Sequence, residues 1–217
     1  MEALIKKVND FVITGEGTSC HWEKTDWIVL DIVGDGPLAY KTKAKALWSD
    51  QGIYFLFDCE DSLISCSKTR DFDELYKEDV IEVFLWPDEE QVIYFEYEIS
   101  PLGYELPLIV PNSNGLYHGW LPFKYANERC IISCTSVYGG EQSSFSKISG
   151  WKAEFFIPYD LLIGLNKCPP EPGMYWRVNL CRLDYDSDPK TQWSWSLDNM
   201  ENNFHNFHNF GKFIFKK

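Results

Sequence analysis

The sequence predicts an all-β protein, an antiparallel β-sandwich of the jelly-roll type with one or two short helices. Three observations predict it: many short runs alternate apolar and polar residues, Gly and Pro punctuate the gaps between them, and helical periodicity is almost absent. The 217 residues are enough to bury a core without disulfide staples. No internal repeat or linker is visible, so we expect residues 1–217 to form a single domain.

The N-terminal third is predicted to hold short strands separated by turn residues. The apolar run at 27–33 ends at Gly34-Asp35-Gly36-Pro37, which is a turn signal, and residues 49–52 fit a hairpin connection. The expected elements are a weakly amphipathic or extended lead-in at 1–18, strands at 27–33, 39–48, 53–59 and 63–67, and one helical turn at 71–76.

The central stretch, residues 76–103, reads YKEDVIEVFLWPDEEQVIYFEYEISPLG and predicts two strands joined by a short acidic turn. Side chains on a strand alternate between its two faces. One face of this pair is therefore apolar and suited to a core. The other face sets carboxylates beside aromatic rings, which suits a polar, ring-shaped ligand such as a sugar and also resembles an ordinary exposed sheet face.

The C-terminal half continues the strand pattern. Pro158 is well suited to the first turn of a helix, so a short helix is expected at 159–165. The other expected elements are loops at 101–125 and 167–173 and strands at 129–138, 151–157, 174–183, 192–197 and 212–217.

The composition restricts the partners. A formal net charge of −13 argues against nucleic acid and anionic membranes as partners, because phosphate binding depends on clustered Lys and Arg. No apolar run approaches the roughly 20 residues of a membrane span. The N-terminus lacks a signal-peptide run, which predicts a cytoplasmic protein as the chain stands, or an extracellular or periplasmic one if a signal was removed. Seven cysteines without a CxxC pair predict free buried thiols and a reducing compartment.

Polar residues of the strands offer candidate chemistry. Glu82, Glu96 and Glu98 could supply the carboxylate pair of a glycoside hydrolase, or could be ordinary solvent-exposed carboxylates. His205 and His208 do not form a metal-ligand set by themselves. Residues 184–188 open like a calcium loop, DYDSD, but the sixth position is Pro189, so an EF-hand is excluded. No cofactor is expected, and a structural calcium in another geometry stays open.

Two aromatic residues and two further polar residues extend this set. Tyr76 and Phe204 lie in polar segments just outside strands, where a core role is less automatic. Arg177 and Asn179 occupy polar strand positions, and they would enlarge the patch of hydrogen-bonding groups if their face joins that of Glu82 and Glu96.

Six segments in order resemble the family 9 carbohydrate-binding modules, and most closely the family 9-like branch found in bacteria. The segments are KALWSDQGIYFLFDCED, EDVIEVFLWPD, YFEYEISPLG, GWKAEFFIPYDLL, YWRVNLCRLD and FHNFGKFIF. The resemblance spans about residues 39–217. It implies a β-sandwich that binds glucose- or xylose-based sugars between two aromatic rings, and a structural calcium whose ligands cannot be aligned with this chain.

The resemblance also implies site residues. The two rings fall at Tyr76 and Phe204, where well-known members have Trp, so a weaker or altered sugar preference is expected. The family's ligand carboxylate falls at Glu82, and a family arginine falls near Glu96, which reverses the charge.

Together these observations predict a non-catalytic carbohydrate-binding domain that serves carbohydrate catabolism. Its partner would be a mono- or oligosaccharide, stacked between Tyr76 and Phe204 and held by Glu82 with Glu96, Arg177 and Asn179. The alternatives are a glycoside hydrolase that uses the acidic strand face and a β-sandwich protein-interaction module.

Overall fold

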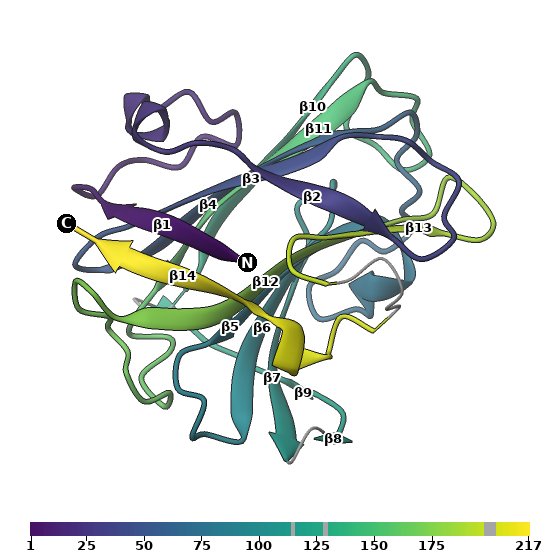
Figure 1. Ribbon diagram of the computed structural model, residues 1–217. Helices are drawn as coiled ribbons and strands as arrows, with labels where there is room; N and C mark the ends of the chain where they lie inside the picture. Colours follow the sequence, from purple (N-terminus) through teal and green to yellow (C-terminus); the bar gives the residue numbers. More distant parts are fainter. Residues whose placement is uncertain (114–115, 128–129, 198–202) are drawn as a thin grey trace.

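Fourteen strands build the fold in the computed structural model (Figure 1), which describes residues 1–113, 116–127, 130–197 and 203–217. Three short 3₁₀ helices in the described part of the chain are η1 (Cys20–Lys24), η2 (Leu75–Lys77) and η4 (Phe207–Asn209). The strands are β1 (Glu2–Lys7), β2 (Ile28–Val33), β3 (Thr42–Trp48), β4 (Gly52–Glu60), β5 (Val80–Trp86), β6 (Ile93–Ile99), β7 (Glu105–Ser113), β8 (Leu116–Tyr117), β9 (Leu121–Pro122), β10 (Ile132–Tyr138), β11 (Gly150–Pro158), β12 (Tyr175–Asp184), β13 (Thr191–Ser194) and β14 (Gly211–Lys216).

The strands form two layers. One layer runs β10-β11-β4-β3, and the other runs β14-β12-β5-β6-β7. Strand β1 lies between β3 and β14 and is parallel to both, whereas all other strand pairs among the described residues are antiparallel. The predicted all-β, antiparallel β-sandwich class is confirmed, with β1 as the parallel exception.

The core fills the space between the layers. Ile81, Val83 and Leu85 of β5 and Phe95, Tyr97 and Ile99 of β6 belong to it and are fully buried. The Tyr97 ring lies 4.9 Å from the ring of Phe155 on β11, between centroids, so the layers meet face to face. Glu82, Glu96 and Glu98 alternate with these core residues and therefore point to the opposite face of the β5–β6 pair. The predicted alternation is thus confirmed.

The expected helix at 159–165 is wrong. This segment forms a series of turns in which the N–H groups of Leu161, Leu162 and Leu165 donate to carbonyls three residues earlier. Four of the seven side chains, those of Tyr159, Leu161, Leu162 and Leu165, enter the core, while Ile163 is 77% exposed. Tertiary burial of these side chains outweighs the weak local preference for a helix that Pro158 suggested.

The structure also corrects the loop expected at 101–125, because β7 (Glu105–Ser113) lies there and pairs with β6 over residues 105–111. Pro107 and Pro111 had argued against a strand. Both prolines pair with β6, but their carbonyls point away from it: the Pro107 carbonyl accepts from Phe123 N and the Pro111 carbonyl accepts from His118 N. Their nitrogens therefore face away from β6, where no ladder donor is needed. The short strand expected at 63–67 is only a bridge between Leu63 and Lys147.

The N-terminal lead-in contributes strand β1 and then a loop that one carboxylate holds. Glu154 Oε2 accepts hydrogen bonds from Thr14 N and Gly15 N, both at 2.8 Å, and Oε1 accepts one from Trp22 Nε1 at 2.7 Å. Glu154 is on β11, in the layer opposite to Glu82. It therefore anchors the N-terminal loop and does not extend the polar face of β5 and β6.

All seven cysteines are unpaired, and three of them, Cys59, Cys66 and Cys181, are buried. The expected free thiols are therefore found, with Cys20 and Cys134 exposed. Within the described residues, no helix is long and apolar enough to cross a membrane.

Candidate functional site

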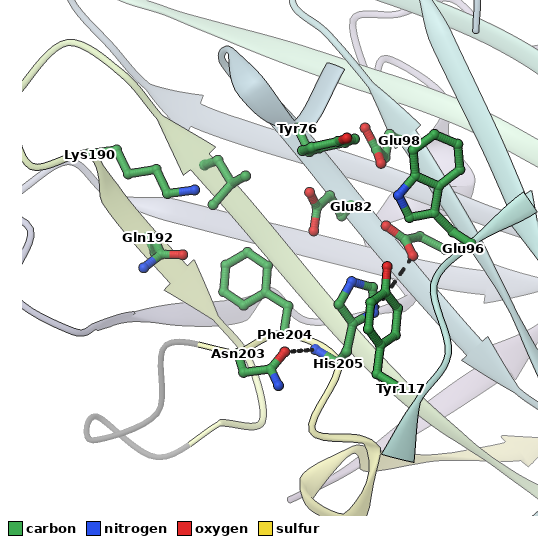
Figure 2. A pocket seen from close by; sticks show the side chains of 12 residues that line it. Tyr76, Glu82, Glu96, Glu98, Tyr117, Lys190, Gln192, Asn203, Phe204 and His205 are labelled. Carbon is green, nitrogen blue, oxygen red and sulfur yellow. Dashed lines mark hydrogen bonds and ion pairs between the residues drawn. The ribbon is translucent and has the colours of Figure 1, made fainter. Parts of the chain in front are cut away.

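A cavity of about 390 Å³ opens on the outer face of the second layer. Strands β5 and β6 supply its floor with Glu82, Glu96 and Glu98, which project from the face opposite to the core (Figure 2). Aromatic residues from four separate segments line it: Tyr76 from η2, Tyr117 from β8, Trp120 from the following loop, and Phe204 before η4. The remaining lining residues are Leu183, Lys190, Gln192, Asn203 and His205.

Four of the six predicted site residues, Tyr76, Glu82, Glu96 and Phe204, meet at this cavity. In Figure 2 the Glu82 side chain lies between the Tyr76 and Phe204 rings. Two hydrogen bonds hold Tyr76 in place: its hydroxyl donates to Glu74 Oε1 at 2.6 Å, and its backbone carbonyl accepts from the Tyr185 hydroxyl at 2.7 Å. The predicted clamp residues thus line the same cavity on both sides of a carboxyl.

Arg177 and Asn179 do not line the cavity, which corrects their predicted place. They are on the same face of β12 as Leu183, which does line it, but Asn179 is four residues away, about 13 Å along a strand. Arg177 Nη2 donates to the His208 carbonyl at 2.6 Å. Asn179 is fully buried, and its Oδ1 accepts hydrogen bonds from Leu180 N, Ser194 Oγ and Ser196 N. Both residues hold neighbouring segments in place.

The floor carboxyls are buried together. Each is at most 4% exposed, and Glu82 and Glu98 are direct partners across β5 and β6. Burial raises the pKa of Glu82 to about 8, and the Lys190 ammonium acts in the opposite direction. Burial first, and the neighbouring Glu82 second, hold the pKa values of Glu96 and Glu98 well above their usual range. The floor is therefore largely protonated at neutral pH in the absence of a cation.

His205 closes one side of the cavity as a neutral ring. Its Nδ1 lies 2.7 Å from the Tyr94 hydroxyl, and its ring stacks on Tyr117 with centroids 4.3 Å apart. Burial lowers the pKa of His205 to about 4. The 4.0 Å approach of His205 Nδ1 to Glu96 Oε2 is therefore a contact between two neutral groups, and it supplies no ion pair.

The residues that sequence reasoning missed at the site come mainly from loops. Tyr117 and Trp120 sit in the segment expected to be loop, where only their aromatic character in polar surroundings was a signal. Glu98 shares the period-2 pattern of Glu96 and could have been assigned with it. Lys190, Gln192 and Asn203 gave no local signal, because their place depends on how β13 and the C-terminal segment cross the sheet.

Protein donors occupy the acidic cluster that includes part of the loop at 184–188. Asp61, Asp184 and Asp186 have one oxygen each within 4.8 Å of one another. However, every carboxylate oxygen of the three already accepts a protein hydrogen bond. The donors are Arg182 Nη2, Trp151 Nε1, Leu63 N, Asp186 N, Ser62 Oγ, Ser65 Oγ and the Tyr40 hydroxyl. The cation that the structure places in this cluster is the Arg182 guanidinium, which pairs with Asp61 and Asp184.

The acidic floor predicts a specific pH dependence of stability. The folded protein keeps protons on these carboxyls at pH values where the unfolded chain, with glutamate pKa values near 4.3, has lost them. Stability is thus fully present below about pH 4.3 and falls as pH rises through about 8. We expect Glu98→Gln to gain at least about 1 kcal/mol over wild type at about pH 9 and little at about pH 4.

Urea unfolding at about pH 4, 7 and 9 measures this gain. Glu141→Gln is the matched control, because Glu141 is exposed and does not line the cavity. A Glu98→Gln protein with the same pH dependence as the control would show that the floor carboxyls titrate normally.

The fold is a β-sandwich, and its outer face carries a cavity with aromatic walls and a carboxyl floor. This arrangement is typical of modules that bind a small polar ligand. The family model described as carbohydrate family 9 binding domain-like matches residues 13–106. Tyr76, Glu82, Glu96 and Glu98 fall within this match. No curated protein sequence matches the chain.

Solved structures match the whole chain. A protein from Bacteroides uniformis described as carbohydrate-binding matches with a TM-score of 0.79 at 16% identity, covering 99% of each chain. A family 9 carbohydrate-binding module from Caldicellulosiruptor kristjanssonii in complex with cellotriose matches with a TM-score of 0.70 at 17% identity, covering 100% of this chain and 94% of that one. The structure of a family 9 module from the same organism with glucose gives 0.69 at 18% identity, with 100% and 96% covered.

The predicted resemblance is therefore confirmed: part of the sequence matches the family 9 binding domain-like model, and the chain is similar in fold to family 9 carbohydrate-binding modules. Residues 13–106 carry the family's sequence pattern, and the complete chain has the fold.

Proposed function

We propose that residues 1–217 act as one non-catalytic carbohydrate-binding domain that holds a sugar in the cavity between Tyr76 and Phe204. One observation carries this proposal: flat aromatic rings flank a floor of hydrogen-bonding carboxyls in a cavity of about 390 Å³. Such a volume is in the range of small-molecule sites.

In the proposed mechanism, the aromatic walls contact the apolar faces of the sugar and the carboxyl floor contacts its hydroxyls. The apolar faces of a pyranose stack on Tyr76 and Phe204, and Tyr117 and Trp120 add further apolar surface. Sugar hydroxyls exchange hydrogen bonds with Glu82 and Glu96, which act as acceptors and, where protonated, as donors. Because the cavity is open to water, we expect affinities of roughly 10 μM to 1 mM, about −4 to −7 kcal/mol.

The comparisons support the partner class. The structures from Caldicellulosiruptor kristjanssonii were solved with cellotriose and glucose, and this chain has the same fold. We propose a glucose- or xylose-based mono- or oligosaccharide as the partner, in carbohydrate catabolism. The seven unpaired cysteines support a reducing compartment as the place of action.

The geometry favours binding over glycoside hydrolysis. A hydrolase needs one ionised carboxylate and one protonated carboxyl on either side of the scissile bond. Here Glu82, Glu96 and Glu98 lie together on one floor, and burial raises the pKa of all three. Hydrolysis of aryl glycosides that Glu82→Gln abolishes would instead establish an enzyme.

Isothermal titration of the wild-type protein with glucose, xylose, cellobiose and xylobiose tests the proposal. We expect at least one of these sugars to bind within the stated range, and we expect Glu82→Ala to weaken it at least about tenfold. Absence of binding to all four, with protein shown to be folded, would leave a β-sandwich interaction module as the better account.

A further inference from the structure

The cavity floor carries more acid than a neutral ligand requires. Glu82, Glu96 and Glu98 each place one oxygen within 4.8 Å of the other two, and all three side chains are almost fully buried. Glu96 Oε2 and both oxygens of Glu98 are buried without a hydrogen-bond partner among the described residues. Unpartnered buried carboxyl oxygens that line a cavity are acceptors aimed at a missing donor.

Protein cations do not supply that donor. Among the described residues, no Lys or Arg nitrogen lies within 4.0 Å of the oxygens of Glu82, Glu96 or Glu98. Lys190 Nζ donates to the Tyr185 hydroxyl at 3.1 Å and acts on Glu82 from a distance. His205, the remaining basic group at the cavity, is neutral because burial lowers its pKa.

We propose that the cavity is selective for an amino sugar, whose protonated free amine sits on the floor of Glu82, Glu96 and Glu98 while its ring stacks on the aromatic walls. This inference rests on the proposed sugar-binding function and names the class of sugar.

An ammonium group matches the floor in number and geometry. It carries three N–H donors and no acceptor, one donor for each carboxyl. Tetrahedral N–H···O contacts of about 2.8 Å place the three acceptors roughly 4.6 Å apart. This spacing is compatible with the floor, where one oxygen from each of Glu82, Glu96 and Glu98 lies within 4.8 Å of the other two.

The walls favour an ammonium over a metal ion. Calcium takes six to eight oxygen ligands, about 2.3–2.6 Å away. This floor offers three carboxyls and is then surrounded by Tyr76, Tyr117, Trp120 and Phe204. Aromatic faces attract an organic cation and the C–H surface of its ring, whereas they offer no ligand to a hydrated dication. Lys190, which also lines the cavity, repels a divalent metal ion more strongly than a singly charged ammonium.

Titration calorimetry at about pH 7, where an α-amino-type amine is still largely protonated, tests the inference with three ligands that share one ring. The ligands are glucosamine, glucose and N-acetylglucosamine. In N-acetylglucosamine the nitrogen is an uncharged amide. We expect glucosamine to bind at least about tenfold more tightly than glucose, and N-acetylglucosamine no more tightly than glucose. Binding of glucosamine should also release protons from the floor, measured as a dependence of the heat on the ionisation enthalpy of the buffer.

Variants assign the preference to the floor. We expect Glu98→Gln and Glu96→Gln each to bring the glucosamine-to-glucose affinity ratio to about one, because the amide carries no charge to pair with the ammonium. Glu141→Gln, at an exposed residue that does not line the cavity, should keep the full ratio.

The outcomes separate the inference from the function on which it rests. Equal binding of glucose and glucosamine overturns the amino-sugar selectivity and leaves sugar binding intact. Failure of all three ligands overturns both. Saturable binding of calcium chloride alone that Glu98→Gln abolishes, or a glucosamine preference that EDTA removes, overturns the inference in favour of a metal site.

Discussion

Arg182→Met is expected to lower the free energy of unfolding by about 3–5 kcal/mol at neutral pH. Arg182 is fully buried and bridges the layers, with Nη2 at 3.0 Å from Asp61 Oδ2 and 2.5 Å from Asp184 Oδ2. Its Nη1 also donates to Thr42 Oγ1 and to the Glu60 carbonyl. Methionine would fill much of the volume but leave two adjacent buried carboxyls without a cation, which accounts for the loss.

Two comparisons isolate the charge effect in urea unfolding. Lys43→Met breaks the partly exposed Lys43–Asp58 ion pair, 3.3 Å between Nζ and Oδ2, and should cost less than about 1 kcal/mol. The triple variant Arg182→Met, Asp61→Asn, Asp184→Asn should recover a large part of the loss, because it removes the unpaired charges. A loss below about 1 kcal/mol in Arg182→Met alone would contradict the role of the guanidinium as the cation of this cluster.

Phe204→Ala is expected to weaken sugar binding at least about tenfold, equivalent to about 1.4 kcal/mol, because it removes one of the two proposed stacking surfaces. Calorimetric titration with the best neutral sugar measures the effect. Phe204 is also 7% exposed and belongs to a buried hydrophobic cluster that includes Phe84 and Phe210, so the variant should lose stability as well.

Phe207→Ala is the matched control for that loss of stability. Phe207 is in the same segment, is 4% exposed, and packs on Trp86 with ring centroids 4.9 Å apart, but it does not line the cavity. We expect it to destabilise the protein comparably and to leave sugar affinity within about threefold. Wild-type affinity in folded Phe204→Ala would remove Phe204 from the site.

The fold was predictable where a strand has one core face. The alternation of Ile81, Val83 and Leu85 with Glu82 specifies both faces of β5, and the structure confirms it. Segments whose geometry depends on distant partners were not predictable. The turns at 159–165 accompany burial of Tyr159, Leu161, Leu162 and Leu165 in the core. Strand β7 accommodates its prolines because their nitrogens point away from β6.

The same distinction between local strand pattern and distant partners applies to the candidate site. Tyr76, Glu82, Glu96 and Phe204 converge as the resemblance implied. Arg177 and Asn179 were misplaced because strand faces alone do not say how far along β12 the cavity extends. The burial of Glu98 and Glu96 without protein donors was also beyond sequence reasoning, because it depends on the loops that carry Tyr117 and Trp120.

The central claim is that a sugar occupies this cavity, and the tryptophan indole signals in ¹H–¹⁵N NMR spectra test it most directly. Trp120 alone among the nine tryptophans lines the cavity, and Trp120→Phe identifies its signal. During titration with the best-binding neutral sugar, the Trp120 indole signal should shift and saturate with the dissociation constant found by calorimetry. Saturable binding that leaves Trp120 unmoved and shifts another indole, such as that of Trp27, would contradict the claim.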